Sequence, residues 1–205
     1  VFARGERVAE NGKLLTKCPH YEWPQTVRKT INLGKKLDPT DFLISVPAGV
    51  SSVKAKVIGV VENQAPTKAL EFDLPVEHGK VQVEGDVCYL ALVERHRGTG
   101  VVVNGFVSGF GYTGSMAISS SVAHDSHHMI VVGTDQKMMA YAANRLGEVG
   151  GGVSVWKDGA EVALVELPIA GLMSDSKASE VAVKAQAIVS AMIDCGCTLN
   201  NAYMQ

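Results

Sequence analysis

The feature that most constrains the fold is a series of short strand-forming runs followed by only two helical stretches. Runs rich in β-branched and aromatic residues, separated by Pro, Gly and Asn, predict strands at 42–46, 53–61, 69–74, 87–93, 101–107, 116–122 and 129–132. A later pair, 153–156 and 162–167, flanks the hairpin signal Lys157-Asp158-Gly159. This order predicts an α+β fold with a mainly antiparallel sheet and helices on one face.

Two segments have helical spacing. Thr134 or Asp135 can cap a helix whose apolar residues share one face and which stops at Gly150. A second helix is predicted from about residue 176 to 195, with Gly196 as its stop.

The N-terminal part predicts a different organisation. Residues 1–17 contain two short strands around Asn11-Gly12, a type I′ turn signal, and we expect them to form a hairpin. Residues 18–41 hold three prolines and scattered basic residues without a period, which predicts a connecting segment with a solvated face. Residues 42–205 form the third unit. Because the chain opens without Met and stops without a closing element, we expect a longer parent protein.

Composition narrows the functional class. Among 205 residues, 46% are hydrophobic and 20% charged, which is typical of a globular protein. The net charge of −2 gives no general attraction to nucleic acid or to an anionic membrane. The longest apolar run, 162–173, is broken by Glu166 and Pro168, and no signal peptide is visible. Cys18, Cys88, Cys195 and Cys197 form no C-x-x-C, so we expect reduced thiols and a cytoplasmic protein.

A dense polar cluster follows the predicted strand 116–122. Residues 124–128 (HDSHH) bring three imidazoles and a carboxylate within five positions, which could ligate a metal or relay protons. Their spacing imitates the zinc motif H-E-x-x-H, with Asp125 in the place of the glutamate, but that motif requires a helix. Residues 129–132 (MIVV) prefer a strand, so we expect either a functional loop at a pocket rim or a hydrogen-bonded turn.

Two other segments carry reactive side chains. Glu94, Arg95 and His96 lie at a strand end before a Gly-Thr-Gly turn, and they form either a surface salt-bridge cluster or a set of donors and acceptors facing the same pocket. The loop 168–175 (PIAGLMSD) delivers Ser174 and Asp175 to a helix start, where capping explains them.

Two further matches lack their structural context. Residues 109–114 (GFGYTG) spell G-x-G-x-x-G, but a strand-like segment follows instead of the helix that would hold a pyrophosphate. We interpret these glycines as a tight turn or a close approach to a ligand. His20 and Glu22 form an H-x-E without the P-C-x-x-C that zinc nucleobase deaminases need.

Several motifs point to one family when they are taken together. They are 57–60 (VIGV), 93–100 (VERHRGTG), 105–111 (GFVSGFG), 121–128 (SVAHDSHH), 131–134 (VVGT), 142–146 (AANRL), 150–152 (GGG) and 167–175 (LPIAGLMSD). This combination resembles the C-terminal domain of bacterial adenine deaminases, which belong to the amidohydrolase superfamily. The resemblance covers nearly the whole chain. Residues 1–15 resemble the strand pair with which such enzymes leave the catalytic barrel, so the resemblance implies that residues 1–17 end a composite β-sandwich.

The resemblance implies an enzyme of purine salvage that hydrolyses adenine to hypoxanthine and ammonia. It implies a catalytic barrel whose metal pair, manganese or iron, activates water for attack at C6. The ligands of that barrel have no counterpart here, so the resemblance implies one inactive piece of a metal-dependent hydrolase, with no cofactor of its own. It also implies a homo-oligomer, with adenine and the barrel as partners.

We assign no catalytic step to the candidate pocket residues, and three roles remain open for them. The candidates are His124, Asp125, Ser126, His127, His128, Glu94, Arg95 and His96. They could supply polar contacts at the mouth of the adenine pocket. They could instead hold a turn in a structural or oligomerisation domain, or form an independent metal-binding module.

Overall fold

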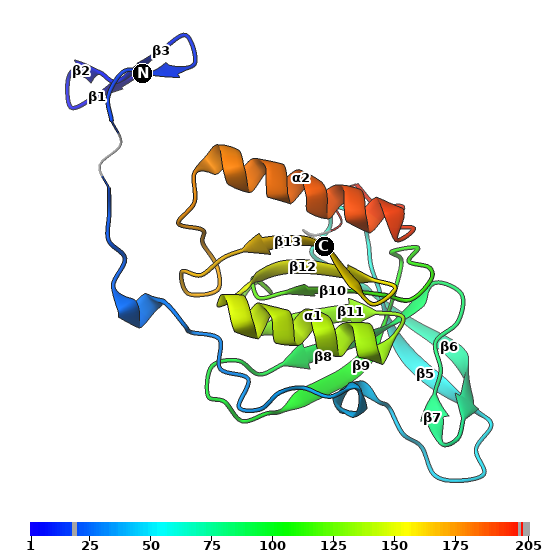
Figure 1. Cartoon of the computed structure of the whole chain (residues 1–205). Coiled ribbons are helices and arrows are strands. Elements are labelled where there is room, and N and C mark those ends of the chain that lie inside the picture. Colours follow the sequence, from blue (N-terminus) through cyan, green and yellow to red (C-terminus); the bar gives the residue numbers. More distant parts are fainter. Residues whose placement is uncertain (18–19, 201, 203–205) are drawn as a thin grey trace.

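A nine-stranded sheet forms the centre of the molecule (Figure 1). A computed structural model describes residues 1–17, 20–200 and 202. The strands of the sheet are β5 (Ser52–Gly59), β6 (Lys68–Glu77), β7 (Lys80–Val81), β8 (Val87–Val93), β9 (Val102–Ser108), β10 (Met116–Ser120), β11 (Met129–Gly133), β12 (Gly152–Lys157) and β13 (Ala160–Glu166). Their order is β13-β12-β10-β11-β8-β9-β5-β6-β7, and only β5 and β9 pair in parallel. The expected α+β class and mainly antiparallel sheet are confirmed.

The two helices are close to their expected bounds. α1 (Gln136–Val149) begins after Asp135, whose carboxylate accepts hydrogen bonds from the backbone N–H groups of Lys137 and Met138. It ends at Gly150, which has a φ of 85° in the left-handed region. α2 (Ala178–Asp194) follows the last strand. Within the described residues, no helix is long and apolar enough to cross a bilayer.

The helices lie on opposite faces of the sheet, which corrects the expectation of helices on one face (Figure 1). Neighbouring residues of β12 point to opposite faces. Ser154 Oγ donates to the carbonyl of Ala142 in α1, whereas Val155 belongs to the core that contains Ile188 of α2. Because Gly152 to Val155 are all buried, β12 needs a cover on both sides, and one helix supplies each.

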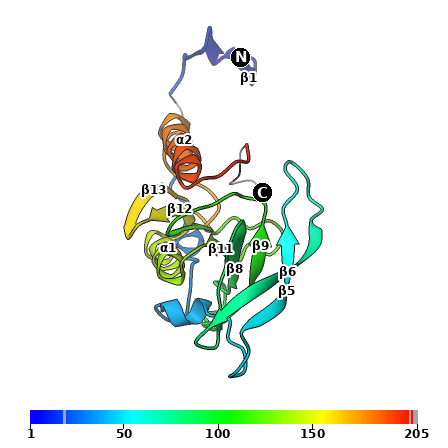
Figure 2. The same cartoon turned by 90° about the vertical axis from the view of Figure 1, so that its right-hand side faces the viewer.

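The N-terminal residues form two small hairpins that stand apart from the sheet (Figures 1 and 2). β1 (Phe2–Ala3) pairs with β2 (Glu6–Arg7), and β3 (Ala9–Glu10) pairs with β4 (Lys13–Leu14). The turn predicted at Asn11-Gly12 is confirmed, with positive φ at both positions. The first hairpin was not predicted.

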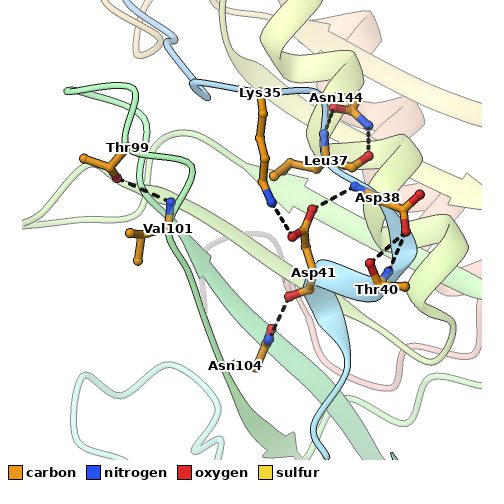
Figure 3. Close-up of polar contacts among 9 residues, drawn as sticks. All are labelled: Lys35, Leu37, Asp38, Thr40, Asp41, Thr99, Val101, Asn104 and Asn144. Atoms are coloured by element: carbon orange, nitrogen blue, oxygen red, sulfur yellow. Dashed lines mark hydrogen bonds and ion pairs between the residues drawn. The ribbon is translucent and has the colours of Figure 1, made fainter.

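The second half of the connecting segment packs into the main core. Leu33 and Leu37 of the segment, and Phe42 directly after it, are buried beside α1 and the sheet. Figure 3 shows how polar contacts hold the segment in place. The side chain of Asn144 accepts a hydrogen bond from the Leu37 N–H at 2.9 Å and donates one to the Leu37 carbonyl at 2.8 Å. Asn104 on β9 donates to the Asp41 carbonyl at 2.8 Å.

The run 42–46, expected to be a strand, forms no strand. A 3₁₀ turn, η2 (Pro39–Phe42), occupies its beginning, and only Ser45 makes a bridge, to Lys80. Asp38 and Asp41 form a capping box and Pro39 fixes the first turn, so local capping overrides the strand propensity of the residues that follow.

The cysteines fit the sequence prediction where they are described. Cys88, Cys195 and Cys197 are free and buried. Cys18 and the chain end at 203–205, both used in the sequence analysis, lie outside the described residues.

Phe42→Ala tests whether η2, the turn that ends the connecting segment, is anchored in the domain core. Phe42 is fully buried, so its truncation is expected to lower the free energy of unfolding by about 3–5 kcal/mol. Urea unfolding followed by circular dichroism measures the change. Phe72→Ala, at an exposed position of β6, is the matched control. Equal effects of the two substitutions would show that Phe42 is not part of the core.

Candidate functional site

Three loops meet at one end of the central strands, where β8, β10 and β13 end and β9, β11 and β12 begin. We name them the loop cluster: residues 94–101, 121–128 and 167–175. All eight candidate residues from the sequence lie in the first two loops. The third loop contains the segment 168–175 that was considered separately.

Arg95 joins the three loops. Its side chain is buried, with 1% of its surface exposed. Nε donates to the His127 carbonyl at 2.5 Å, and Nη2 donates to the carbonyls of Ser121 and Ala170 at 3.3 and 3.2 Å. The Arg95 carbonyl accepts a hydrogen bond from the Asn32 N–H at 2.8 Å. Arg95 therefore connects both other loops and the connecting segment.

No carboxylate neutralises this guanidinium among the described residues, because all of its hydrogen-bond partners are backbone carbonyls. Desolvation by burial lowers the pKa of Arg95, although an arginine stays protonated in proteins. Gly171 leaves room for the guanidinium group of Arg95, because a Cβ at this position would lie 2.9 Å from Arg95 Nη1. The surface salt-bridge interpretation of Arg95 is wrong.

Glu94 holds the turn that follows β8. Its carboxylate accepts hydrogen bonds from the N–H groups of His96, Arg97 and Thr99 and from the Thr99 hydroxyl, at 2.6–3.1 Å. Desolvation acts to raise the pKa of Glu94, but these hydrogen bonds outweigh it and bring the pKa to about 2. The carboxylate is therefore an acceptor in a folded turn and has little capacity left for a ligand.

His127 and His96 each bind a backbone carbonyl. His127 Nδ1 lies 2.6 Å from the Val122 carbonyl, and His96 Nε2 lies 3.1 Å from the Ser126 carbonyl. Because a carbonyl oxygen only accepts, each of these ring nitrogens must carry the proton. The two imidazoles thus help to fold the loop 121–128.

The backbone of this loop is strained. Ala123, Asp125 and His127 all have positive φ, which residues with a Cβ rarely adopt. The bond from Arg95 to the His127 carbonyl and the bond from the His127 N–H to the Ala123 carbonyl hold this conformation. Strained backbone persists where the surroundings fix it, often at functional sites.

His124 and Asp125 are the candidates that remain free. Both are exposed, and their side chains make no hydrogen bond to another described residue. The ring of His124 lies 6.1 Å from that of His127. A carboxylate and an imidazole at the tip of a held loop can bind a ligand without breaking the fold.

His128 has an unpaired nitrogen. Its Nδ1 is buried without a hydrogen-bond partner in the described structure, and its ring lies 4.8 Å from the His96 ring. The Ser126 hydroxyl is occupied by the His128 N–H, at 3.3 Å. His128 is therefore a third group with hydrogen-bonding capacity left.

Ser119 on β10 and Ser121 at the start of the loop are structural. Ser119 Oγ lies 3.0 Å from both the Ala142 carbonyl and Ser154 Oγ. Ser121 Oγ donates to the Gly171 carbonyl at 2.6 Å and accepts from the Gly152 N–H at 2.7 Å. Sequence reasoning missed these roles, although the strand period already places 119 and 121 on one face.

The segment 168–175 does not cap α2, which corrects that interpretation of Ser174 and Asp175. The N-cap position is Lys177, without a side-chain bond. Asp175 instead pairs with Arg28 at 2.6 Å, and that bond, the largest contribution, lowers the pKa of Asp175. The Ala170 N–H also donates to the Val27 carbonyl. The connecting segment is therefore tied to this loop too.

The glycine-rich loop lies at the other end of β9 and has an internal partner. The Asp86 carboxylate accepts hydrogen bonds from the N–H groups of Gly109 and Gly111 at 2.7 and 2.6 Å, and from the Ser108 hydroxyl. A strand, β10, follows the loop, as the sequence predicted. These amides hold a carboxylate of the protein in the place where a nucleotide phosphate would bind.

The loop cluster does not fit a metal ion. Residues 121–128 form an irregular loop between β10 and β11, so His124 and His128 do not share a helix face. Within residues 1–17, 20–200 and 202, no group of three or more His, Cys, Asp or Glu side chains could hold a metal. The described arrangement can offer hydrogen bonds and charge to a ligand.

Comparison with known proteins gives a family match. Residues 64–205 match the model of the adenine deaminase C-terminal domain. The whole chain is 67% identical to an adenine deaminase of Ruegeria pomeroyi and 41% identical to one of Moorella thermoacetica, and covers 34% of each. The chain thus spans about a third of the length of the curated relatives it matches.

Arg95→Met tests the buried cation. The substitution keeps much of the side-chain volume but leaves three carbonyls without their donor, so the free energy of unfolding is expected to fall by about 3 kcal/mol. Urea unfolding measures it. Arg97→Met, at an exposed neighbour, is expected to change it by less than about 0.5 kcal/mol. A wild-type stability for Arg95→Met would contradict the assignment.

The low pKa of Glu94 predicts a pH-dependent contribution to stability. Its folded-state pKa of about 2 lies below the ordinary value of 4.5. The carboxylate therefore stabilises the fold fully above pH 4.5, and this stabilisation is lost as the pH falls through about 2. Wild type should unfold at higher urea than Glu94→Gln at pH 7, with a gap that closes toward pH 2. Glu84→Gln is the exposed control, and a gap independent of pH would refute the prediction.

Proposed function

Because this chain belongs to the family of the adenine deaminase C-terminal domain, we propose that it is the C-terminal portion of an adenine deaminase, which hydrolyses adenine to hypoxanthine and ammonia. The observation that carries this proposal is 67% identity over the whole chain to a protein named adenine deaminase. In the proposed domain division, residues 1–17 end a composite β-sandwich, 18–41 connect, and 42–205 form the C-terminal domain.

In this proposal the loop cluster closes the mouth of the adenine pocket, which is formed mainly by the catalytic barrel. His124 and Asp125 are the groups best suited to contact substrate, since they are exposed on a loop whose backbone is held by Arg95. Adenine offers an amino donor and ring-nitrogen acceptors, and an imidazole and a carboxylate can bind both kinds. His128 Nδ1 is a further candidate, because it has no partner in the described structure.

The other candidates are proposed to position this loop. Glu94, Arg95, His96 and His127 use their polar atoms on backbone groups. Ser126 accepts a bond from the His128 N–H. These five residues would affect turnover through the placement of His124 and Asp125.

The metal of such an enzyme, proposed to be manganese or iron, would be held outside the described residues, since they offer no suitable set of ligands. It would activate the water that attacks adenine. This chain's own part is to orient and enclose the substrate, and on its own the chain is proposed to be inactive. We also propose a cytoplasmic homo-oligomer, as the family resemblance implies. We propose no nucleic-acid or membrane partner, because the net charge of −2 gives no general attraction to polyanions.

The alternative is a structural or oligomerisation domain without a catalytic role. It is supported by the number of loop-cluster groups that bind only the backbone. An independent metal-binding module has less support, since His96 and His127 each use a ring nitrogen on a carbonyl. The first alternative predicts that substitutions in the loop change stability and leave kinetics unchanged.

His124→Ala and Asp125→Ala in the full-length deaminase separate these roles. If the loop contacts adenine, each substitution is expected to lower kcat/KM about tenfold or more, the value of one or two hydrogen bonds to a charged group. Steady-state deamination of adenine measures this change, and thermal unfolding checks the fold. His78→Ala, at an exposed turn remote from the loop cluster, is the matched control. Unchanged kinetics in both variants would eliminate substrate contact and support the structural alternative.

A further inference from the structure

Part of one sheet face is not covered by any helix among the described residues. On the α2 side, α2 packs on β12 and β13, and within the described part of the chain no helix covers β8 and β9 (Figure 2). We name the uncovered part the open sheet face: the exposed Leu92, Val101 and Val103 with the partly buried Ile130. Val103 is 60% exposed and Leu92 37%. Large apolar side chains in contact with each other are seldom left in water.

The strand registers make this face continuous. Val103 pairs with Leu92, and Leu92 pairs with Ile130, so the three lie in one row across β9, β8 and β11. The next row joins Gly105, Leu90, Val132 and Ile118, and the last three of these pack in the core that contains Ile188 of α2. A Cβ at Gly105 would meet nothing within 4 Å, which leaves a hollow between Val103 and Val107. A cavity of about 210 Å³, lined mainly by apolar residues that include Leu90 and Ile118, adjoins the second row.

The sequence of β8 is that of a strand buried on both faces. All seven residues, VCYLALV, are apolar, a pattern found in strands that are covered on both sides. β5 differs, because apolar residues alternate there with Ser52, Lys54 and Lys56. Lys54 on β5 pairs with Asp73 on β6 at 3.4 Å, with both side chains exposed. Only the charged half of this sheet face is therefore suited to water.

We propose that the open sheet face packs against the part of the full-length deaminase that precedes the C-terminal domain. This inference rests on the proposed function. About two thirds of the length of the matched relatives lies outside the aligned region, so a large polypeptide is available to cover the face. The N-terminal hairpins stand beyond α2, on the same side of the sheet (Figures 1 and 2).

The open sheet face is also next to the loop cluster. Leu92 lies two residues before Glu94, and Ile130 lies two residues after His128, so both are near the strand ends where the loops begin or end. The connecting segment reaches the domain at the same edge, through the bonds of Val27 to Ala170 and Asn32 to Arg95. Docking through this face brings His124 and Asp125 toward the covering polypeptide, in the arrangement a shared substrate pocket requires.

Thiol labelling of the full-length deaminase tests the docking surface. Val103→Cys and Leu92→Cys report on the open sheet face, and Val183→Cys, at a 72% exposed position of α2, is the matched control. A polar maleimide is applied to each native variant, and labelling is quantified by mass spectrometry on the peptide that contains the new cysteine. The cysteines introduced on the open sheet face are expected to react more than about tenfold more slowly than the control cysteine on α2.

Reaction of both face cysteines at the rate of the control cysteine would overturn the proposal. Protection that disappears when an oligomer is diluted to monomers would also overturn it, because the face would then belong to a second copy. Val103→Glu provides an independent measurement: it is expected to lower the Tm of the full-length protein, while Val183→Glu leaves it unchanged. Equal Tm values would count against docking.

Adenine turnover, measured in parallel on the wild type, separates this inference from the proposed function. Reactive face cysteines in an enzyme that deaminates adenine would refute the docking surface alone. Protected cysteines in a protein without that activity would refute the proposed function and leave the interface in place.

Discussion

The buried guanidinium of Arg95 is the interaction on which the arrangement of the loops depends. Its partners are carbonyls of residues 121, 127 and 170, which belong to two separate loops, and its own carbonyl binds the connecting segment. An unpaired cation in the interior is costly unless its donors are satisfied, so these carbonyls must remain where they are. Gly171 and Ser121 complete the arrangement, one by leaving space for the guanidinium and the other by joining the loop 167–175 to the sheet edge.

This constraint divides one polar motif into two kinds of residue. His127 and Arg95 form hydrogen bonds that fold the loop, whereas the side chains of His124 and Asp125 form none with another described residue. The structural and the substrate-binding interpretations of the motif are therefore not exclusive. A rigid frame with a few free groups is what a binding site needs, because little entropy is then lost when a ligand is bound.

Three features of the molecule lie together at this end of the strands. The connecting segment is attached there by the Arg28–Asp175 pair, the loop cluster lies there, and the apolar row of Val103, Leu92 and Ile130 begins beside it. The sheet is thus asymmetric: its opposite end holds the glycine-rich loop, whose amides are satisfied by Asp86. One end is closed by internal contacts, and the other presents unused polar and apolar groups.

The sequence by itself determined the features that depend on neighbouring residues. The bounds of β8, the cap and stop of α1 and the Asn11-Gly12 turn follow from local period and turn chemistry, and the family followed from long motifs. Only the tertiary structure decided the face on which each helix packs and the roles of Arg95 and Ser121. Arg95 and Ala170 are 75 residues apart, and Ser121 and Gly171 are 50 apart. No local pattern records such pairs, because they form only when distant strands align and bring their loops to one edge.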